Sequence, residues 1–200
     1  MPEVTLDGKK LDFDDTENDS TVGELLKAVE KELKPLRRFI QDIRLDGQPA
    51  PEWRTGAGLR SLICKFNEIS IETGSVEAAA LEGLDTVEGY IKVIKEEINA
   101  CVRDSRVGNP EAEKRFNSLF EGLVEVVKTI EALSGCADAF DIKLFRENPE
   151  NFYLPLLKNL EALKDARNSG DPVLVADMLE YELTPFLDGM ESRIFSCHGA

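Results

Sequence analysis

Short alternating runs of apolar and polar residues fill the first part of the chain, a pattern typical of half-buried strands. The runs Val4-Thr5-Leu6 and Leu11-Asp12-Phe13 flank Asp7-Gly8, a dipeptide typical of tight hairpin turns. A second alternating run, Ile43-Arg44-Leu45, ends at another such dipeptide, Asp46-Gly47. These positions predict a hairpin at the start of the chain, and a strand followed by a second tight turn.

Between the two turns the apolar residues change to helical spacing. Thr21 stands three residues before Glu24, as in a capping box, which predicts the start of a helix. The helix is expected to continue as far as Pro35 through four apolar residues, Leu25, Leu26, Val29 and Leu33. Further along, Leu59 to Phe66 fits either a short helix or a strand.

A last strand is predicted where Ile69 and Ile71 alternate with polar residues, so the order through residue 74 is hairpin, helix, strand, loop and strand. This stretch resembles the ubiquitin-like β-grasp superfold, which implies a hairpin packed on one helix, with later strands completing the sheet. Modifiers and sulfur carriers of this superfold end in a free Gly-Gly tail. Here Gly74 is single and a helical pattern follows it, so conjugation and sulfur-carrier chemistry are not expected.

From residue 75 onward the apolar residues recur at helical spacing. Between Val76 and Cys101 they step by three or four residues for more than three heptads. Three further helical runs follow, separated by Gly, Asn, Asp and Pro: Phe116 to Leu133, Phe152 to Leu163, and Ala176 to Ile194. Four long helices with short connections predict an antiparallel four-helix bundle.

The sequence therefore predicts an α+β protein with two domains, a β-grasp-like domain over 1–74 and an acidic helical bundle over 75–200. The formal net charge is −15; residues 1–74 carry 15 acidic and 11 basic groups, and residues 75–200 carry 24 and 13. So acidic a surface argues against nucleic acid as a partner, because its backbone is polyanionic. Neither a membrane-spanning run nor a signal peptide is visible, which predicts a cytoplasmic protein.

Residue types common in active sites are scarce. His198 is the only histidine, and the four cysteines, Cys64, Cys101, Cys136 and Cys197, lie 37, 35 and 61 positions apart, without zinc-ligand or redox-pair spacing. No glycine-rich phosphate-binding motif is present. We therefore expect no catalytic residues, no cofactor and no metal site, and a protein that is not an enzyme.

The last predicted helix is apolar on two opposed faces. One face is expected to point to the core, through Ala176, Leu179, Leu183, Phe186, Met190 and Ile194. The other carries Leu174, Met178, Tyr181 and Pro185, and Pro185 is expected to kink the helix after Tyr181. This second stripe is covered by the first domain or by a second copy of the chain, or it binds another protein.

Residues 171–187 are similar to the closing helix of uncharacterised bacterial proteins with the same two-part layout, which implies a bacterial, cytosolic protein. We expect a non-enzymatic protein-interaction module, such as an adaptor, assembly factor or chaperone-like binder, that uses the second stripe. One alternative is a small-molecule binder or enzyme in the interdomain cleft, with Asp177, Glu180 and Tyr181 as acid–base groups. The other is a structural homodimer built on the same stripe.

Overall fold

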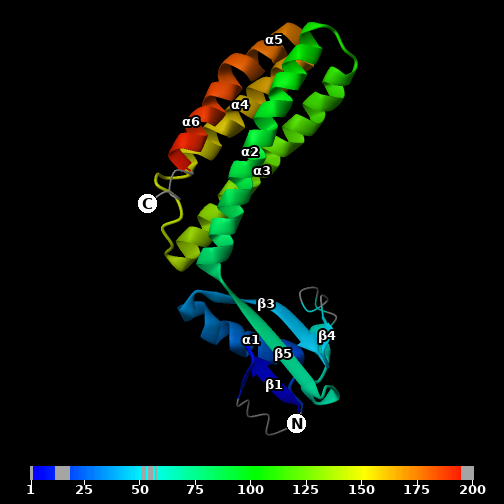
Figure 1. The fold of residues 1–200 in the computed structure, drawn as a ribbon, viewed down its shortest axis with the longest axis vertical. Helices are drawn as coiled ribbons and strands as arrows, with labels where there is room; N and C mark the ends of the chain where they lie inside the picture. The colour runs from blue at the N-terminus through cyan, green and yellow to red at the C-terminus, as the bar shows by residue number, and fades with distance from the viewer. Residues whose placement is uncertain (1, 12–18, 51–52, 54–55, 57, 195–200) are drawn as a thin grey trace. The chain divides into compact units, whose positions relative to one another are not determined.

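The computed structural model describes residues 2–11, 19–50, 53, 56 and 58–194, and its architecture is α+β (Figure 1). It divides into two compact units, residues 1–79 and 80–200. The division falls within the long helix α2 (Val76–Arg106), which follows the last strand of the sheet directly.

The N-terminal unit is a mixed five-stranded sheet with the order β2-β1-β5-β3-β4. The central strand β5 pairs in parallel with β1 and antiparallel with β3. Helix α1 shares one core with the sheet, in which Leu25, Ile43, Ile69 and Ile71 are fully buried. The elements are β1 (Glu3–Leu6), β2 (Lys9–Lys10), α1 (Val22–Leu33), β3 (Arg38–Leu45), β4 (Gln48–Pro49) and β5 (Glu68–Ser75).

Both Asp-Gly turns form as predicted, and each also holds one end of β5. The two aspartates and the two glycines have φ angles of 49° to 77°, as tight hairpin turns of this type require. The Asp7 carboxylate accepts hydrogen bonds from the Thr73 amide (2.8 Å) and hydroxyl (2.7 Å), near the end of the strand. The Asp46 carboxylate accepts hydrogen bonds from the amides of Asn67 (2.7 Å) and Glu68 (2.9 Å), at its start.

The predicted second strand of the first hairpin is described only in part. Strand β2 comprises Lys9 and Lys10, and the Leu11 amide donates a hydrogen bond to the Val4 carbonyl (2.8 Å). Asp12 and Phe13, which complete the alternating run in the sequence, lie outside the described residues.

The local signals around α1 are also confirmed. The Thr21 hydroxyl accepts a hydrogen bond from the Glu24 amide (3.3 Å), and the Glu24 carboxylate accepts one from the Thr21 amide (2.8 Å), which completes the capping box. The stretch from Leu59 to Phe66, for which helix and strand were both open, contains short 3₁₀ helices. They are η3 (Gly58–Arg60) and η4 (Ile63–Lys65); a further one, η1 (Lys34–Leu36), follows α1.

Gly74 has a packing role in the sheet. A Cβ atom at this position would lie 2.9 Å from the ring of Phe39 on the neighbouring strand β3. Such a contact is too close for any side chain, so the glycine lets the Phe39 ring lie across β5. This is a structural reason for a glycine here that needs no reactive tail.

The C-terminal unit is helical. In Figure 1, α3 returns alongside α2, and α4 and the last helix follow. One core joins these helices, and its fully buried side chains include Leu84, Ile91, Leu123, Ile130 and Leu156. Beyond α2 the elements are α3 (Glu111–Phe140), α4 (Glu150–Asn168), and a continuous last helix made of α5 (Pro172–Asp177), the π-helical segment η5 (Met178–Leu183) and α6 (Thr184–Ile194).

The π-helical segment explains why one core position expected from the sequence is wrong. Pro185 has no amide hydrogen to donate to the carbonyl of Tyr181, and the preceding turn is widened. There the Thr184 amide donates to the Leu179 carbonyl, five residues earlier, and the Thr184 hydroxyl donates to the same oxygen at 2.9 Å. The wider turn shifts the helical phase, so Leu187 is fully buried, whereas Phe186 is only half-buried at the edge of the core.

The other expected core positions of the last helix are buried where the structure describes them. They are Ala176, Leu179, Leu183 and Met190. The side chain of Ile194, the last expected position, lies outside the described part of the chain.

Across the described ranges, no helix combines the length and the apolar character that crossing a membrane would need.

Candidate functional site

The second stripe of the last helix is exposed at three of its four predicted positions. Tyr181 is 66% exposed and Leu174 is 43% exposed, and Pro185 is also exposed. Met178 is half-buried and packs against the helical core. The structure therefore leaves Leu174, Tyr181 and Pro185 accessible within the helical unit, and assigns Met178 mainly to packing.

The π-helical segment also changes which side chains share a face. Each residue of a π-helix advances through a smaller angle than a residue of an α-helix. One α turn and one wider π turn together span the eight steps from Val173 to Tyr181, so these two side chains come into line. Val173 is 59% exposed, and strictly α-helical spacing does not place it on the second stripe. We call Val173, Leu174, Tyr181 and Pro185 the outer face.

Arg106, the last residue of α2, holds the last helix beside Tyr181. Its guanidinium forms an ion pair with Glu180 and lies 3.7 Å from the carboxylate of Asp177. Hydrogen bonds from the guanidinium to Tyr181 and Glu180 raise the pKa of Arg106 above its ordinary value. Arg106 therefore lies beside the exposed Tyr181, and the two carboxylates considered as acid–base groups are engaged by an arginine.

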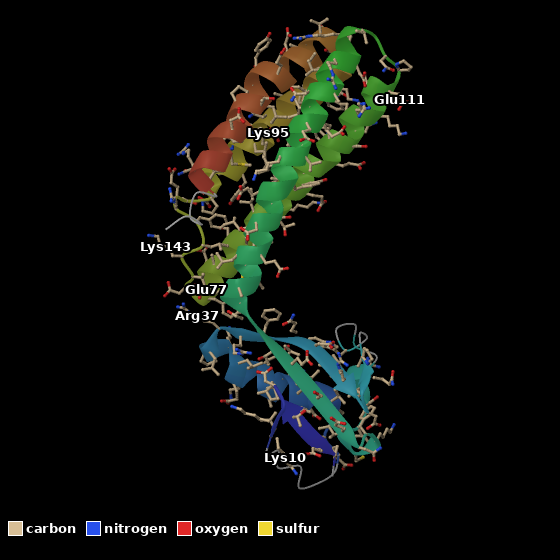
Figure 2. All side chains as sticks on the ribbon, viewed as in Figure 1. Lys10, Arg37, Glu77, Lys95, Glu111 and Lys143 are labelled. Carbon is tan, nitrogen blue, oxygen red and sulfur yellow. The ribbon has the colours of Figure 1, made fainter. Side chains whose placement is uncertain are left out.

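A second ion pair ties the last helix to α2. Lys95, which is labelled on α2 in Figure 2, pairs with Asp188 of α6. The exposed carboxylates of Asp177 and Glu182 lie on the same helix. The outer face is therefore an apolar surface with acidic neighbours.

The three cysteines that the structure places differ in burial. Cys101 is fully buried in α2, and burial raises the pKa of its thiol; Cys64 is exposed and Cys136 is half-buried. No group of three or more His, Cys, Asp and Glu side chains in the described part of the chain is arranged to hold a metal ion. Cys197 and His198 lie outside the described residues.

Residues 82–193 match the family described as "Domain of unknown function (DUF8042)". The chain belongs to this family. The DUF8042 segment includes the whole outer face together with Arg106 and Lys95.

The chain is also similar to an uncharacterized protein of Treponema pallidum (strain Nichols). The two are 22% identical over 200 residues, which cover 96% of each chain. This similarity extends over both the sheet unit and the DUF8042 segment. No solved structure matches.

Proposed function

We propose that this chain is a non-enzymatic protein-interaction module, an adaptor, assembly factor or chaperone-like binder, that binds its partner through the outer face. The observation that supports this most is Tyr181, a large aromatic side chain that is 66% exposed. Tyrosine is enriched at interface hot spots because it buries a large area and loses little conformational freedom. Exposed Val173, Leu174 and Pro185 extend the apolar surface around it.

Charge indicates the chemistry of the partner. Residues 75–200 carry 24 acidic and 13 basic groups, and Glu182 is exposed on the last helix, where Asp177 and Asp188 pair with Arg106 and Lys95. Complementary potentials speed association and disfavour wrong partners. The partner segment is therefore expected to combine apolar side chains for the outer face with basic side chains for its acidic neighbours.

The alternative functions have less support from the geometry. Asp177 and Glu180 both interact with Arg106, and the Glu180 side chain is 37% exposed, which does not favour acid–base catalysis. A homodimer through the outer face would place the acidic flanks of two copies near each other. Repulsion between like charges opposes that arrangement.

We also infer the finer fold. The strand order β2-β1-β5-β3-β4 with a parallel β1–β5 pair and one helix supports a β-grasp fold for the N-terminal unit. Four successive helical stretches around one core support an antiparallel four-helix bundle for the other unit. The β-grasp superfold hosts many unrelated functions, so it assigns no activity. The similarity to a Treponema pallidum protein supports a bacterial origin, and we propose a cytoplasmic location.

Site-specific cross-linking tests the proposed function. A photoreactive phenylalanine derivative replaces Tyr181 in the full chain, expressed in its source cell, and a control chain carries it in place of Tyr90, a 43% exposed tyrosine on α2. A partner protein should cross-link from position 181 and not from position 90. The purified partner should bind the Tyr181→Glu variant at least tenfold more weakly than the unsubstituted chain. It should bind the Tyr90→Glu variant less than twofold more weakly than the unsubstituted chain.

Two results would refute the proposal. Identical products from both positions would mean that position 181 has no specific partner. Cross-linking of the chain only to itself, with a dimer that Tyr181→Glu dissociates, would replace the proposed function with the homodimer.

A further inference from the structure

The helical unit has an open cavity of about 510 Å³ where the α2–α3 turn and the α4–α5 turn meet. Figure 2 labels Glu111, the first residue of α3, at this end of the unit. The two turns have similar sequences, Gly108-Asn109-Pro110 and Gly170-Asp171-Pro172, and both glycines have positive φ angles. Apolar atoms dominate the lining, which includes Pro110, Ala112, Phe116, Pro172 and Val175.

Polar side chains on the two turns already have partners within the chain. The side-chain amide of Asn109 donates a hydrogen bond to the Asp104 carboxylate (3.0 Å), and its oxygen accepts one from the backbone amide of Glu111 (3.1 Å). Asp171 accepts hydrogen bonds from the first backbone amides of α5. These groups therefore serve the turns themselves.

The arginine of the lining is engaged as well. Arg167 donates to Glu113 (3.0 Å), and its guanidinium lies 5.2 Å from the centre of the Phe116 ring. The lining that remains for an occupant is therefore mainly apolar.

Arginine ion pairs neutralise the charges around this cavity. Arg106 joins α2 to the last helix through Glu180, Arg115 joins α3 to α2 through Asp104 (2.8 Å), and Arg167 joins α4 to α3 through Glu113 (3.0 Å). Residues 103–116 and 164–177 together contain six acidic and six basic groups. This end is electrically balanced, although residues 75–200 as a whole carry 24 acidic and 13 basic groups.

An exposed valine stands next to a lining residue of the cavity in each of the two turns. Val107, beside the lining residue Gly108, is 77% exposed, and Val173, beside the lining residue Pro172, is 59% exposed. Val173 and Leu174 also belong to the outer face. Pro172, which lines the cavity, directly precedes Val173 and Leu174 in α5, so the outer face begins beside the cavity.

We propose that the partner is a basic amphipathic helix that places an apolar side chain in this cavity and lies along the outer face. This inference rests on the proposed function and deepens it by naming the partner's chemistry. An apolar end of the helix matches the neutral cavity, and basic side chains further along it match the exposed Glu182. From Val173 to Pro185 the outer face extends about 18 Å at 1.5 Å per residue, which a partner helix of roughly 12 residues covers.

A defined peptide tests the inference with the full chain. The probe is a dye-labelled 15-residue peptide of leucine and lysine in amphipathic helical order, and binding is measured by fluorescence anisotropy at 0.15 M salt. One control peptide replaces every lysine with glutamate, and another replaces every leucine with alanine. The leucine–lysine peptide should bind at least tenfold more tightly than either control.

Matched variants locate the contact. Val107→Asp, next to the lining residue Gly108, should weaken peptide binding at least fivefold, and Val93→Asp, at a 52% exposed valine in the middle of α2, less than twofold. Added negative charge by itself attracts the lysines, so weaker binding by the Val107 variant reports a lost apolar contact. Circular dichroism checks that both variants remain folded.

Three outcomes of the peptide experiment would overturn the inference. If the peptide does not bind, or the alanine–lysine peptide binds equally well, the partner chemistry is wrong. If Val107→Asp and Val93→Asp have the same effect, the cavity is not part of the contact. If only Tyr181→Glu weakens binding, the outer face binds without the cavity. The cross-linking experiment decides the proposed function independently of all these results.

Discussion

Two adjacent leucines on α4 provide a test of how the helical unit is packed. Leu156 is fully buried in the core, whereas Leu157 is 40% exposed. Replacing a fully buried leucine with alanine costs about 2–5 kcal/mol, because apolar surface is lost from the core and a cavity remains. At Leu157 solvent fills the vacated space and alanine slightly favours the helix, so the expected cost is below about 1 kcal/mol. The predicted difference between Leu156→Ala and Leu157→Ala is therefore at least about 1 kcal/mol.

The assay is urea unfolding of the full chain, followed by circular dichroism at 222 nm, which mainly reports helices. Leu156→Ala should shift the helical transition to clearly lower urea without a change in its slope, and Leu157→Ala should leave it nearly unchanged. Equal losses for the two variants, or a larger loss for Leu157→Ala, would refute the helical phase and the packing assigned to α4.

Three further substitutions test other features. Hydrogen bonds from Thr73 lower the pKa of Asp7 in the folded chain. The ionised carboxylate therefore stabilises the folded unit at every pH above the pKa of Asp7 in the unfolded chain, which is about 4. This stabilisation is lost as the pH falls through the lower pKa of the folded chain. Asp7→Asn should therefore reduce the free energy of unfolding more at pH 7 than at pH 2.5. The measurement is urea unfolding followed by the fluorescence of Trp53, the only tryptophan in the sequence. Equal losses at the two pH values would contradict the pKa argument for Asp7. Thr21→Ala removes the cap of α1 and should cost about 1 kcal/mol in the same fluorescence assay, with no shift of the helical transition. Tyr181→Glu should change the stability of the helical unit by less than about 0.5 kcal/mol, and a larger loss would show that Tyr181 serves packing.

Short-range signals predicted much of the fold. Asp7-Gly8 and Asp46-Gly47 specify tight turns through the conformations that their own residues favour. Thr21 and Glu24 satisfy each other's backbone amides within one turn of helix. Because these interactions connect neighbours in the sequence, their outcome does not depend on the rest of the molecule.

The candidate site was predictable only in part. The exposure of Leu174, Tyr181 and Pro185 agrees with the two-sided pattern, but the sequence does not reveal whether Pro185 bends the helix or widens the turn before it. The widened turn brings Val173 into line with Tyr181, and strictly α-helical spacing does not. Ion pairs such as Arg106–Glu180 join residues 74 positions apart, so spacing in the sequence does not indicate them.

The position of β5 has a consequence for the order of folding. This strand lies between β1 and β3 but comes last in the N-terminal unit, and the aspartate of each Asp-Gly turn accepts a hydrogen bond from one of its backbone amides. A ribosome therefore synthesises both hairpins and α1 before the strand that joins them exists. Pairing across so long a stretch of chain is slow, whereas contacts between successive helices form quickly. The sheet is thus expected to be the slower of the two units to fold, even though its residues are synthesised first.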